Sequence, residues 1–514
     1  MIEESANFTR QGVMVVTKAR VGVRLRRFRE ERGLTQAALA SALGISPSYV
    51  NQLESSQRPL TASVLLKLAS VYDADLQQFS AEDADRLVAQ LRDVLTDPSV
   101  GEQISMAEIR ELAAAMPAVG RYVIELHRRY RHGRDVNETI MTRIDAGAAG
   151  SMSVPPPMAQ EEVQELFYAR RNYFPALDLA AEQIFAQAGL AIGNAATGIT
   201  ERLARRHSIR VADLPAGGQA VKRRYDPAAR VLALSPLLNS GQRAFQLATH
   251  LASVELGTEI DQIVTEANLS GDDARMLCRI GLASYFAGAL VLPYQPFLAG
   301  AEALGYDIAL LQRRFDVGYE TVAHRLSTLQ RPGARGVPFI FVRVDRAGNI
   351  SKRQSATSFH FSRVGGSCPL WNVYEAFVHP GEIQTQLAQM PDGRSYLWVA
   401  RTVSRRYGGY GTLGKTFAVG LGCDLRHAQR LVYSHGLDLA SPSALVPIGP
   451  GCKVCDRNTC PQRAFPAIGK PLDADPHHGS FIPYATGDSV AGLSGQGLPG
   501  NHGAAHIGMP DLPA

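Results

Sequence analysis

The sequence lacks any uninterrupted run of about 18 apolar residues, the length that a membrane-spanning helix needs. The first residues, Met1-Ile2-Glu3-Glu4-Ser5, do not show the basic-then-apolar pattern of a secretion signal. Cysteine is scarce, with six among 514 residues, which excludes a disulfide scaffold. The formal net charge is only +5, so any nucleic-acid-binding surface must be local. We therefore expect a cytoplasmic, globular protein of roughly two to four domains.

Residues 24–69 have the pattern of a helix-turn-helix unit. Thr35 and Ser46 stand where helix N-caps are expected, and Pro47 occupies the first position of the second helix, which accepts proline. The apolar residues are spaced so that each helix buries one face. These residues are Leu39, Leu43, Ile45, Val50 and Leu53.

The second helix of this unit exposes a composition that suits the major groove of DNA. Asn and Gln can bond bidentately to adenine, while Ser, Tyr and Gln reach phosphates. A helical bundle without a ligand would more often expose Glu, Lys and Arg there, and arginines just upstream can neutralise phosphates. The segment from Leu25 to Thr61 resembles the phage-repressor-like (XRE) helix-turn-helix family. The predicted DNA-contacting residues are Arg27, Thr35, Gln36, Ser46, Ser48, Tyr49, Asn51, Gln52 and Arg58.

The rest of the chain divides by composition and periodicity into a multidomain protein, mainly α in its N-terminal two-thirds and α+β in its C-terminal domain. A stretch rich in Ala, Gly, Ser and Pro predicts a linker, and the Gly-, Pro- and His-rich end predicts disorder. The expected segments are a flexible arm at 1–17, a DNA-binding domain at 18–83, a helical connector at 84–145, a linker at 146–159, a helical middle domain at 160–330, a C-terminal domain at 331–474 and a tail at 475–514. Strands are expected around 221–225, 231–234, 338–344, 396–401 and 416–421.

Residues 243–253 resemble the helix that carries the His-Glu-x-x-His motif in metallopeptidases related to IrrE and ImmA. Thr249 and Ser253 occupy the zinc-histidine positions, and His250 replaces the general-base glutamate. A second signature helix has Leu282 in place of the third ligand. Zinc hydrolysis needs three protein ligands and a base. We therefore expect no catalytic residues and no enzyme, but a retained scaffold whose former active-site groove binds a small molecule.

Cys452, Cys455 and Cys460 form the second cluster with chemical potential. Three thiolates at these spacings can surround one metal centre, with a fourth ligand from Cys423 or Cys368. Uneven spacing, a sequence-distant fourth ligand and the proline after the third cysteine favour an iron–sulfur cluster. A structural zinc site is the alternative.

Four motifs of the C-terminal region resemble the short-chain fatty acyl-CoA regulator family, which includes actinobacterial regulators of propionate and acetate (glyoxylate) metabolism. The resemblance covers most of the chain in the same order of domains. It implies a cytoplasmic, dimeric or higher-oligomeric transcription factor that binds operator DNA, senses short-chain acyl-CoA and, in some members, carries a [4Fe-4S] cluster. The motifs are Gly336-Val337-Pro338-Phe339, Cys368-Pro369-Leu370-Trp371, Gly414-Lys415-Thr416-Phe417 and the stretch from Cys460 to Pro466.

Two alternative functions remain open from the sequence. One is a regulator whose only signal is the redox state of an iron–sulfur cluster, with a merely structural middle domain. The other is an active zinc peptidase fused to a DNA-binding head, against which the missing ligands argue. Basic and aromatic groups at Arg171, Tyr173 and Arg205 are candidates for binding the effector, although a solvated helix face explains each of them equally well.

The stretch from Gly409 to Thr416 matches the phosphate-loop pattern letter for letter. That motif works only where a helix begins at its Lys-Thr pair, so that the helix N-terminus faces a phosphate. Here the following residues, 417–422, are β-like and broken by glycines. We therefore predict a loop between two strands instead of a nucleotide site.

Overall fold

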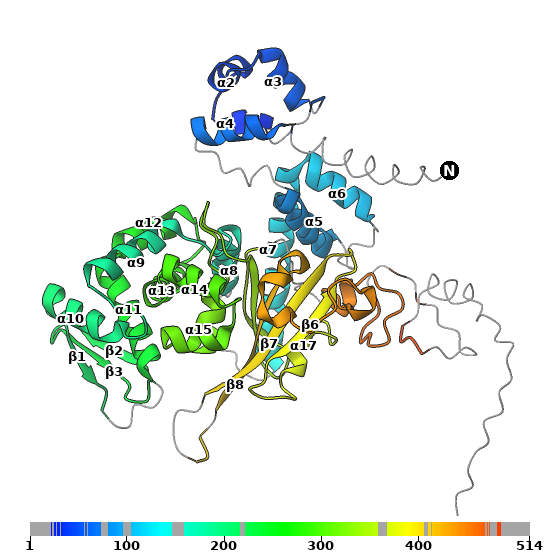
Figure 1. Cartoon of the computed structure of the whole chain (residues 1–514). Helices are drawn as coiled ribbons and strands as arrows, with labels where there is room; N and C mark the ends of the chain where they lie inside the picture. The colour runs from blue at the N-terminus through cyan, green and yellow to red at the C-terminus, as the bar shows by residue number, and fades with distance from the viewer. Residues whose placement is uncertain are drawn as a thin grey trace, which may run out of the picture.

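The computed structural model shows a small helical head, a helical connector and a larger two-part body (Figure 1). The predicted arm, the linker up to residue 158 and the tail lie outside the described residues, except for 481–484. The structure describes residues 32–55, 57–58, 60–72, 81–95, 104–145, 159–215, 221–357, 367–405, 410–412 and 414–467, with 22, 25–26, 28–30, 470, 472 and 481–484.

The head folds as the sequence predicts. The Thr35 hydroxyl accepts a hydrogen bond from the Ala38 N–H, and the Ser46 hydroxyl accepts one from the Tyr49 N–H, so both serve as N-caps. Gly44 ends the first helix at φ +61°, a left-handed conformation that favours glycine. The predicted apolar residues are buried except Ile45, which is half-buried. The helices are α2 (Gln36–Leu43), α3 (Pro47–Glu54) and α4 (Ala62–Tyr72).

Three helices form the connector, which joins the head to both parts of the body. Ser105 and Glu108 make a reciprocal capping box at the start of α6. Arg86 of α5 donates hydrogen bonds to the carbonyl oxygens of Tyr168 (3.1 Å) and Thr357 (2.8 Å), which lie in different parts of the body. The helices are α5 (Ala81–Leu95), α6 (Met106–Ala115) and α7 (Pro117–Asp145).

The middle domain is built around two long helices, α11 and α13, which pack against each other inside its core. Within the described ranges, α13 is long and apolar enough to cross a membrane, but most of it is buried as a core helix. The small sheet has the order β1-β3-β2, and its β2–β3 hairpin was predicted. The elements are α8 (Ala159–Ala169), α9 (Pro175–Gln187), α10 (Ala195–His207), β1 (Arg210–Asp213), β2 (Arg223–Asp226), β3 (Val231–Leu234), α11 (Ser240–Glu255), α12 (Gly257–Glu266), α13 (Asp272–Val291), α14 (Tyr294–Ala303), α15 (Ile308–Phe315) and α16 (Tyr319–Leu326).

The C-terminal domain contains a six-stranded sheet of order β5-β4-β8-β7-β6-β9, antiparallel except for the β6–β9 pair. The predicted strands became β4, β7 and β8, and the rejected phosphate-loop match lies between β7 and β8, with Lys415 and Thr416 in a strand. The elements are β4 (Phe339–Val344), β5 (Ile350–Ser355), α17 (Asn372–Glu375), β6 (Gln384–Gln389), β7 (Ser395–Arg405), β8 (Lys415–Asp424), β9 (Val446–Pro447) and the 3-10 turns η3 (Leu425–Arg430), η4 (Val432–Ser434), η5 (Pro442–Ala444) and η6 (Cys452–Val454).

The two faces of this sheet bury side chains in different cores, because successive residues of a strand point to opposite faces. Phe341 and Leu421 pack into the core of the middle domain. Val342 and Trp398 pack into a second core with Trp371. The middle and C-terminal domains therefore share one continuous core, which the predicted boundary at residue 330 does not convey.

Candidate DNA-binding surface, effector cavity and cysteine loop

The outer face of α3 carries most of the residues predicted to contact DNA. Ser48 and Asn51 are exposed, while Tyr49 and Gln52 are half-buried. The Ser46 hydroxyl caps the helix and lies 3.0 Å from the Ser48 hydroxyl. Arg58 is exposed, and Arg27 lies outside the described residues. The surface therefore offers amide and hydroxyl groups of the kind that read base edges in a major groove.

A charged network beneath this surface fixes α3 against α2. Arg29 donates to both carboxylate oxygens of Glu54, at 2.6 and 3.2 Å. The Gln36 amide donates to Glu54 (2.8 Å) and to the Asn51 side-chain oxygen (3.4 Å). Gln36 therefore positions Asn51 in addition to its predicted role toward DNA.

We expect Asn51→Ala to weaken binding to specific DNA by about 1–3 kcal/mol, or roughly 5- to 150-fold, because alanine offers no bidentate partner for a base edge. The measurement is fluorescence anisotropy on a duplex selected from a random pool. Ser41→Ala, at an exposed position of α2, is the matched control and should leave affinity unchanged. Equal affinity of Asn51→Ala for the selected and a scrambled duplex would agree with this assignment, whereas full retention of specificity would refute it.

The residues at the positions of the lost peptidase ligands make local or core contacts instead of forming a metal site. The Thr249 hydroxyl donates to the Phe245 carbonyl (2.7 Å), and the Ser253 hydroxyl donates to the His250 carbonyl (2.7 Å). Leu282 is completely buried. The His250 ring packs against Tyr225 at 4.4 Å between ring centroids, and burial lowers its pKa to about 4, so it is neutral.

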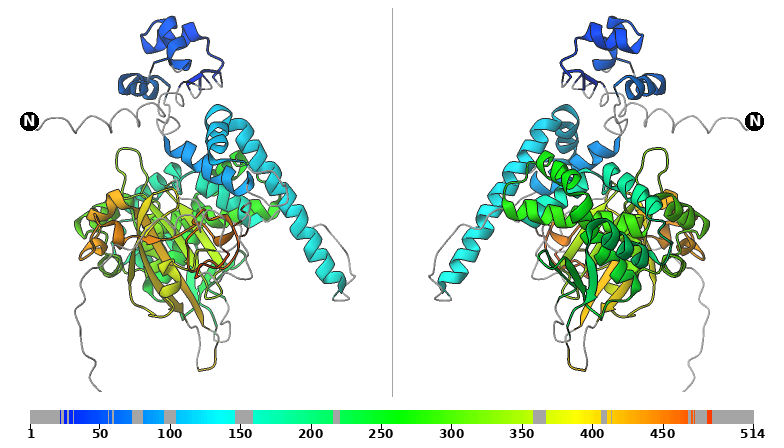
Figure 2. Two further views of the ribbon diagram at one scale, coloured as in Figure 1. Left: turned by 90° about the vertical axis from the view of Figure 1, so that its right-hand side faces the viewer. Right: turned by 90° about the vertical axis from the view of Figure 1, so that its left-hand side faces the viewer.

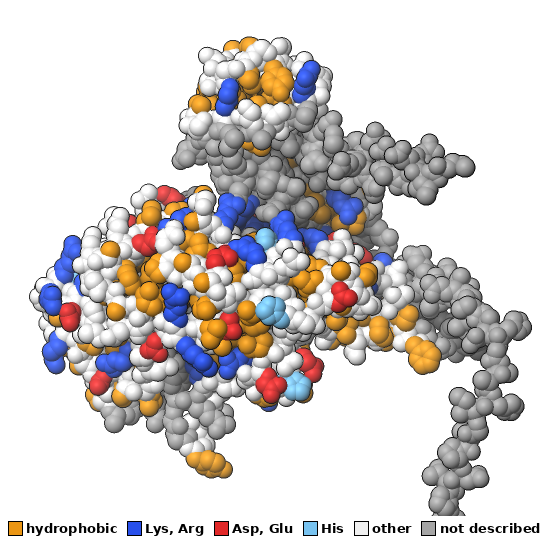
Figure 3. Space-filling view, in the orientation of Figure 1, with side chains coloured by type: hydrophobic (Ala, Val, Ile, Leu, Met, Phe, Trp, Pro, Cys, Tyr) orange, Lys and Arg blue, Asp and Glu red, His pale blue; other side chains and the backbone are white. Residues whose placement is uncertain are grey.

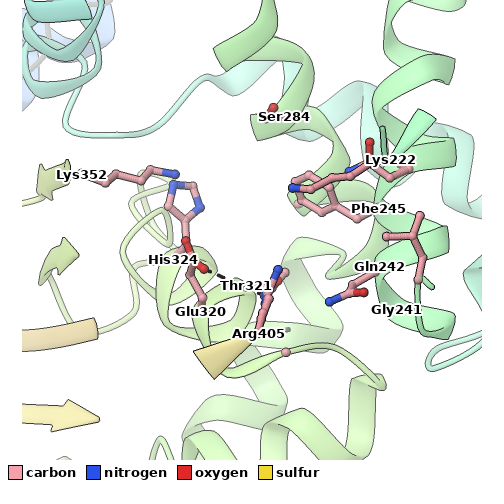
Figure 4. Close-up of a pocket in the computed structure, with 14 residues that line it drawn as sticks. Lys222, Gly241, Gln242, Phe245, Ser284, Glu320, Thr321, His324, Lys352 and Arg405 are labelled. Carbon is pink, nitrogen blue, oxygen red and sulfur yellow. Dashed lines mark ion pairs between the residues drawn. The ribbon is translucent and has the colours of Figure 1, made fainter. Parts of the chain in front are cut away.

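A cavity of about 170 Å³ opens where α11, α13 and α16 meet β5 and β7 (Figure 4). It lies between the middle domain and the C-terminal sheet, with Lys352 and His324 on one side and Lys222 and Phe245 on the other. Sites that enclose a whole drug-sized ligand have about 300–1,000 Å³. This cavity can therefore enclose only a short group, with the remainder of a larger ligand outside.

The polar lining of the cavity favours an anionic or carbonyl-bearing ligand. Burial lowers the pKa of the Lys352 ammonium to about 8, although the nearby Glu320 carboxylate partly opposes that shift. Glu320, the acidic side chain of the described lining, is engaged by Arg343 (2.7 Å) and lies 3.9 Å from Arg405. Burial holds the pKa of His324 well below its usual range, and its Nε2 has no hydrogen-bond partner among the described residues. A half-buried lysine and a ring nitrogen without a hydrogen-bond partner among the described residues thus belong to the lining of one cavity.

The residues predicted from sequence to bind the effector do not share a pocket. Arg171 is half-buried at a turn, and Arg205 pairs with Glu201 on the outer face of α10. The Tyr173 ring is buried, and its hydroxyl accepts from Arg331 (3.3 Å). Basic side chains on this face of the middle domain are interspersed with acidic ones instead of forming one field (Figure 3). None of the three predicted residues lines the cavity.

The cysteine loop lies against the second core of the C-terminal domain. Backbone N–H groups of Gly449 and Leu370 donate to the Cys368 sulfur, and the Ala464 N–H donates to the Cys452 sulfur (3.5 Å). A Cβ at Gly449 would lie 2.6 Å from the Cys455 sulfur. Burial raises the pKa of the Cys368 thiol, and the neighbouring Cys455 and Cys452 thiols raise it further.

The structure separates the two candidates for the fourth ligand. Cys368 belongs to the second core beside the loop, whereas Cys423 of β8 points into the core shared with the middle domain. Burial raises the pKa of the Cys423 thiol to about 12. No three Cys, His, Asp or Glu side chains within the described ranges are gathered closely enough to hold a metal ion. The donor set nevertheless fits a soft metal, because three sulfurs share one neighbourhood with backbone N–H groups directed at them.

Arg463 holds this loop in shape. Its side chain is buried and donates to the carbonyl oxygens of Cys452 (2.9 Å) and Cys455 (3.0 Å). Arg457 ties the same loop to the sheet by donating to the Gln389 carbonyl (2.7 Å). Positive charge therefore surrounds the thiols, which would offset the charge of a thiolate-ligated group.

Three family models match consecutive parts of the chain. A helix-turn-helix domain matches residues 20–81, an IrrE N-terminal-like domain matches 204–327, and the C-terminal domain of the short-chain fatty acyl coenzyme A regulators matches 328–484. The head, the degenerate peptidase-like scaffold and the cysteine-bearing domain are therefore each matched in the predicted order.

Similar proteins are known over nearly the whole length. The HTH-type transcriptional regulators RamB and PrpR of Mycobacterium tuberculosis are 51% and 53% identical, over 91% and 90% of this chain and 99% and 95% of their own lengths. A propionyl-CoA carboxylase regulator of Cereibacter sphaeroides is 40% identical over 91% of this chain and 98% of its own. A solved Mycobacterium tuberculosis transcriptional regulator is 55% identical, with a TM-score of 0.62, and covers 64% of this chain and 100% of that chain.

Proposed function

Because the chain belongs to the short-chain fatty acyl coenzyme A regulator family, we propose that it is a transcription regulator that controls short-chain acyl-CoA metabolism in response to acyl-CoA itself. It is a DNA-binding regulator, as its relatives are, and not an enzyme. A relative's name, propionyl-CoA carboxylase regulator, supports propionyl-CoA metabolism as the regulated process. We place its action in the cytoplasm, as a homodimer on operator DNA.

The observation that carries the effector proposal is the cavity that contains Lys352 and His324. A short acyl thioester fits a space of this size, with its carbonyl oxygen as a partner for the Lys352 ammonium. The phosphates of coenzyme A would remain at the mouth, where Lys222 and Arg405 supply positive charge. Since the cavity lies between the middle domain and the C-terminal domain, a bound ligand would change how these two domains pack against each other.

The cysteine loop supports a second, separable proposal. We propose that Cys368, Cys452, Cys455 and Cys460 hold a [4Fe-4S] cluster, with zinc as the alternative. Such a cluster would supply sensitivity to oxygen or redox state when bound. A regulator that responds only to this cluster is the second candidate function, and it predicts no effect of acyl-CoA on the protein.

We expect Lys352→Met to abolish stabilisation by propionyl-CoA, since methionine keeps the volume of the side chain but removes its charge. In the wild type, stabilisation should be strongest below pH 8. It should fall as the pH rises past about 8, because the buried ammonium then loses its proton. The measurement is the shift in thermal unfolding temperature with propionyl-CoA against free coenzyme A, on anaerobic and aerobic protein.

Arg205→Met is the matched control, because Arg205 is exposed on α10 and lies outside the cavity. It should leave the propionyl-CoA response intact. A wild-type protein that responds to oxygen but to no acyl-CoA would support the redox-only regulator instead. A response retained in Lys352→Met would place the effector site elsewhere.

A further inference from the structure

Helix α7 carries an apolar stripe that no described residue covers. Its side chains recur every three or four residues, so they share one face of the helix, about 20 Å long. Soluble monomers rarely expose so continuous an apolar surface without a use for it. The exposed fractions are 53% at Met116, just before the helix, 47% at Val119, 65% at Tyr122, 48% at Leu126 and 52% at Tyr130.

Up to residue 131, the face of α7 opposite the stripe packs against the connector and the body, so the stripe cannot turn inward. A Cβ at Gly120 would lie 3.1 Å from a methyl group of Leu91, which shows how closely α7 and α5 approach. Ile124 packs into the connector core, and Arg128 pairs with Glu165 of α8 (3.7 Å). Figure 2 shows α7 extending away from the body at the side of the molecule. The stripe therefore faces outward on an anchored helix.

We propose that a second copy of this chain covers the stripe, with the two α7 helices antiparallel and a two-fold axis at Leu126. This register places Tyr122 opposite Tyr130 of the second copy and Leu126 opposite its equivalent, so every aromatic ring gains an aromatic partner. The interface is isologous, as two-fold symmetry requires. It deepens the homodimer proposed above by naming the surface that makes it.

The charges beside the stripe fit the same arrangement. Glu125 and Arg129 form an ion pair on one flank of the helix (3.1 Å). In the antiparallel register, Glu125 of one copy and Arg129 of the other are offset by only about 3 Å along the helices, so they can pair across the interface. A parallel pair would bring this flank against the opposite one, which carries Arg131 and packs on the connector core through Ile124. Such exposed pairs contribute little affinity but set orientation.

The size of the stripe sets the strength of the contact. Five side chains that are each about half exposed would bury on the order of 1,000 Å² across both copies, just below the standard range of stable interfaces. We therefore expect dissociation in the micromolar range in free solution. Two heads held together on DNA would bind two half-sites, and their effective concentration would strengthen the complex.

The orientation is tested by disulfide crosslinking of the full-length protein. Leu126→Cys lies on the axis and should crosslink to itself under mild oxidation. Tyr122→Cys and Tyr130→Cys should each fail to self-crosslink, because their equivalents lie about 12 Å apart along the helices. A mixture of these two variants should crosslink readily. Wild-type protein, with its native cysteines, gives the background.

Charge reversal tests the pairing independently. Glu125→Arg and Arg129→Glu should each raise the dimer dissociation constant about tenfold by bringing like charges together. An equimolar mixture should restore the dimer as a heterodimer, which a folding defect could not do. Sedimentation velocity measures both.

Substitutions in and outside the stripe decide whether the interface lies on α7. Leu126→Asp should make the protein monomeric, whereas Val378→Asp, at a residue 64% exposed in the C-terminal domain, should not. A wild-type dimer unaffected by Leu126→Asp would refute this interface while leaving a dimeric regulator. A wild type that is monomeric both free and on DNA would refute the dimer itself, without touching the effector cavity.

Discussion

Replacing Glu54 with alanine is expected to unfold the DNA-binding head and abolish DNA binding. The Glu54 carboxylate is 3% exposed and accepts two hydrogen bonds from Arg29 and one from Gln36. Its loss leaves the largely buried guanidinium without a carboxylate, and removing one partner of a buried pair costs about 3–5 kcal/mol. A domain of roughly 60 residues buries too little surface to tolerate such a loss.

The tryptophans make this experiment specific to the head. The chain has two, Trp371 and Trp398, and both lie in the C-terminal domain. Unfolding of the head should therefore lower the helical circular dichroism signal while leaving tryptophan fluorescence unchanged. Binding to a labelled duplex at low salt should be lost with it, since even non-specific contacts need a folded head.

Glu30→Ala is the matched control for Glu54→Ala. Glu30 pairs with Arg26 (2.9 Å), and both of these side chains are more than half exposed. Glu30 also lies 3.6 Å from Arg29, but in this variant Arg29 keeps both of its hydrogen bonds to Glu54. Exposed pairs contribute about 0–1 kcal/mol, so this variant should keep its fold and its DNA affinity. If Glu54→Ala retained both properties as well, the network beneath α3 would not stabilise the head.

The head was predictable because its signals are local. N-caps at Thr35 and Ser46, a glycine turn and an apolar period of three to four residues are all read within a few turns of chain. The strands β4, β7 and β8 were found for the same reason, since their apolar runs are continuous. Strands β5 and β6 were missed, because Ile350–Ser355 and Gln384–Gln389 are mostly polar and are strands only through their pairing.

The cavity proposed to bind the effector could not be predicted from sequence, because it forms between segments far apart in the chain. Lys222, His324 and Lys352 each look ordinary in their own segment. Lys352 lies in a polar strand, and only the packing of the sheet against the middle domain buries its ammonium. The sequence prediction instead chose clustered basic residues such as Arg205, because a run of like charges is easy to see in a sequence. In the structure, Arg205 is a solvent-exposed side chain that pairs with Glu201. Burial of isolated charges is a tertiary property that no short pattern reports.

The cysteine cluster could be predicted from the sequence only in part. The spacing of Cys452, Cys455 and Cys460 was visible in the sequence. The sequence did not distinguish Cys368 from Cys423 as the fourth ligand, because each stands next to an apolar segment. In the structure, Cys423 packs on the sheet face shared with the middle domain, whereas Cys368 packs in the second core beside the loop. This placement supports Cys368 as the proposed fourth ligand, because moving Cys423 to the other face would require a change in the register of β8.

Replacing Cys455 with serine is expected to remove the proposed metal from the C-terminal domain and to loosen the loop. A hydroxyl is a poor ligand for iron or zinc where a thiolate is a good one. A bound metal would tie the loop to Cys368, so its loss should also lower the unfolding temperature of this domain. Arg463 still donates to the loop carbonyls, so the loop should be loosened instead of lost.

Metal content, colour and tryptophan fluorescence together distinguish an iron–sulfur cluster from zinc at the cysteine loop. An iron–sulfur cluster should colour anaerobic protein brown, bleach in air and quench Trp371, which lies three residues from Cys368 and packs on Trp398 (4.6 Å between centroids). Loss of the cluster in Cys455→Ser should then raise fluorescence, whereas loss of zinc should not. Cys368→Ser, Cys452→Ser and Cys460→Ser should each behave like Cys455→Ser.

Two buried cysteines provide the matched controls. Cys423→Ser changes a thiol on the far face of the sheet, and Cys278→Ser changes one inside α13, so both should retain the metal and affect packing alone. Loss of metal from Cys423→Ser but not from Cys368→Ser would identify Cys423 as the fourth ligand instead of Cys368. In that case β8 would have to rearrange to bring Cys423 to the loop. Full iron and zinc content and unchanged fluorescence in all three loop variants would show that the loop holds no metal. Any redox response of the regulator would then have to arise elsewhere in the chain.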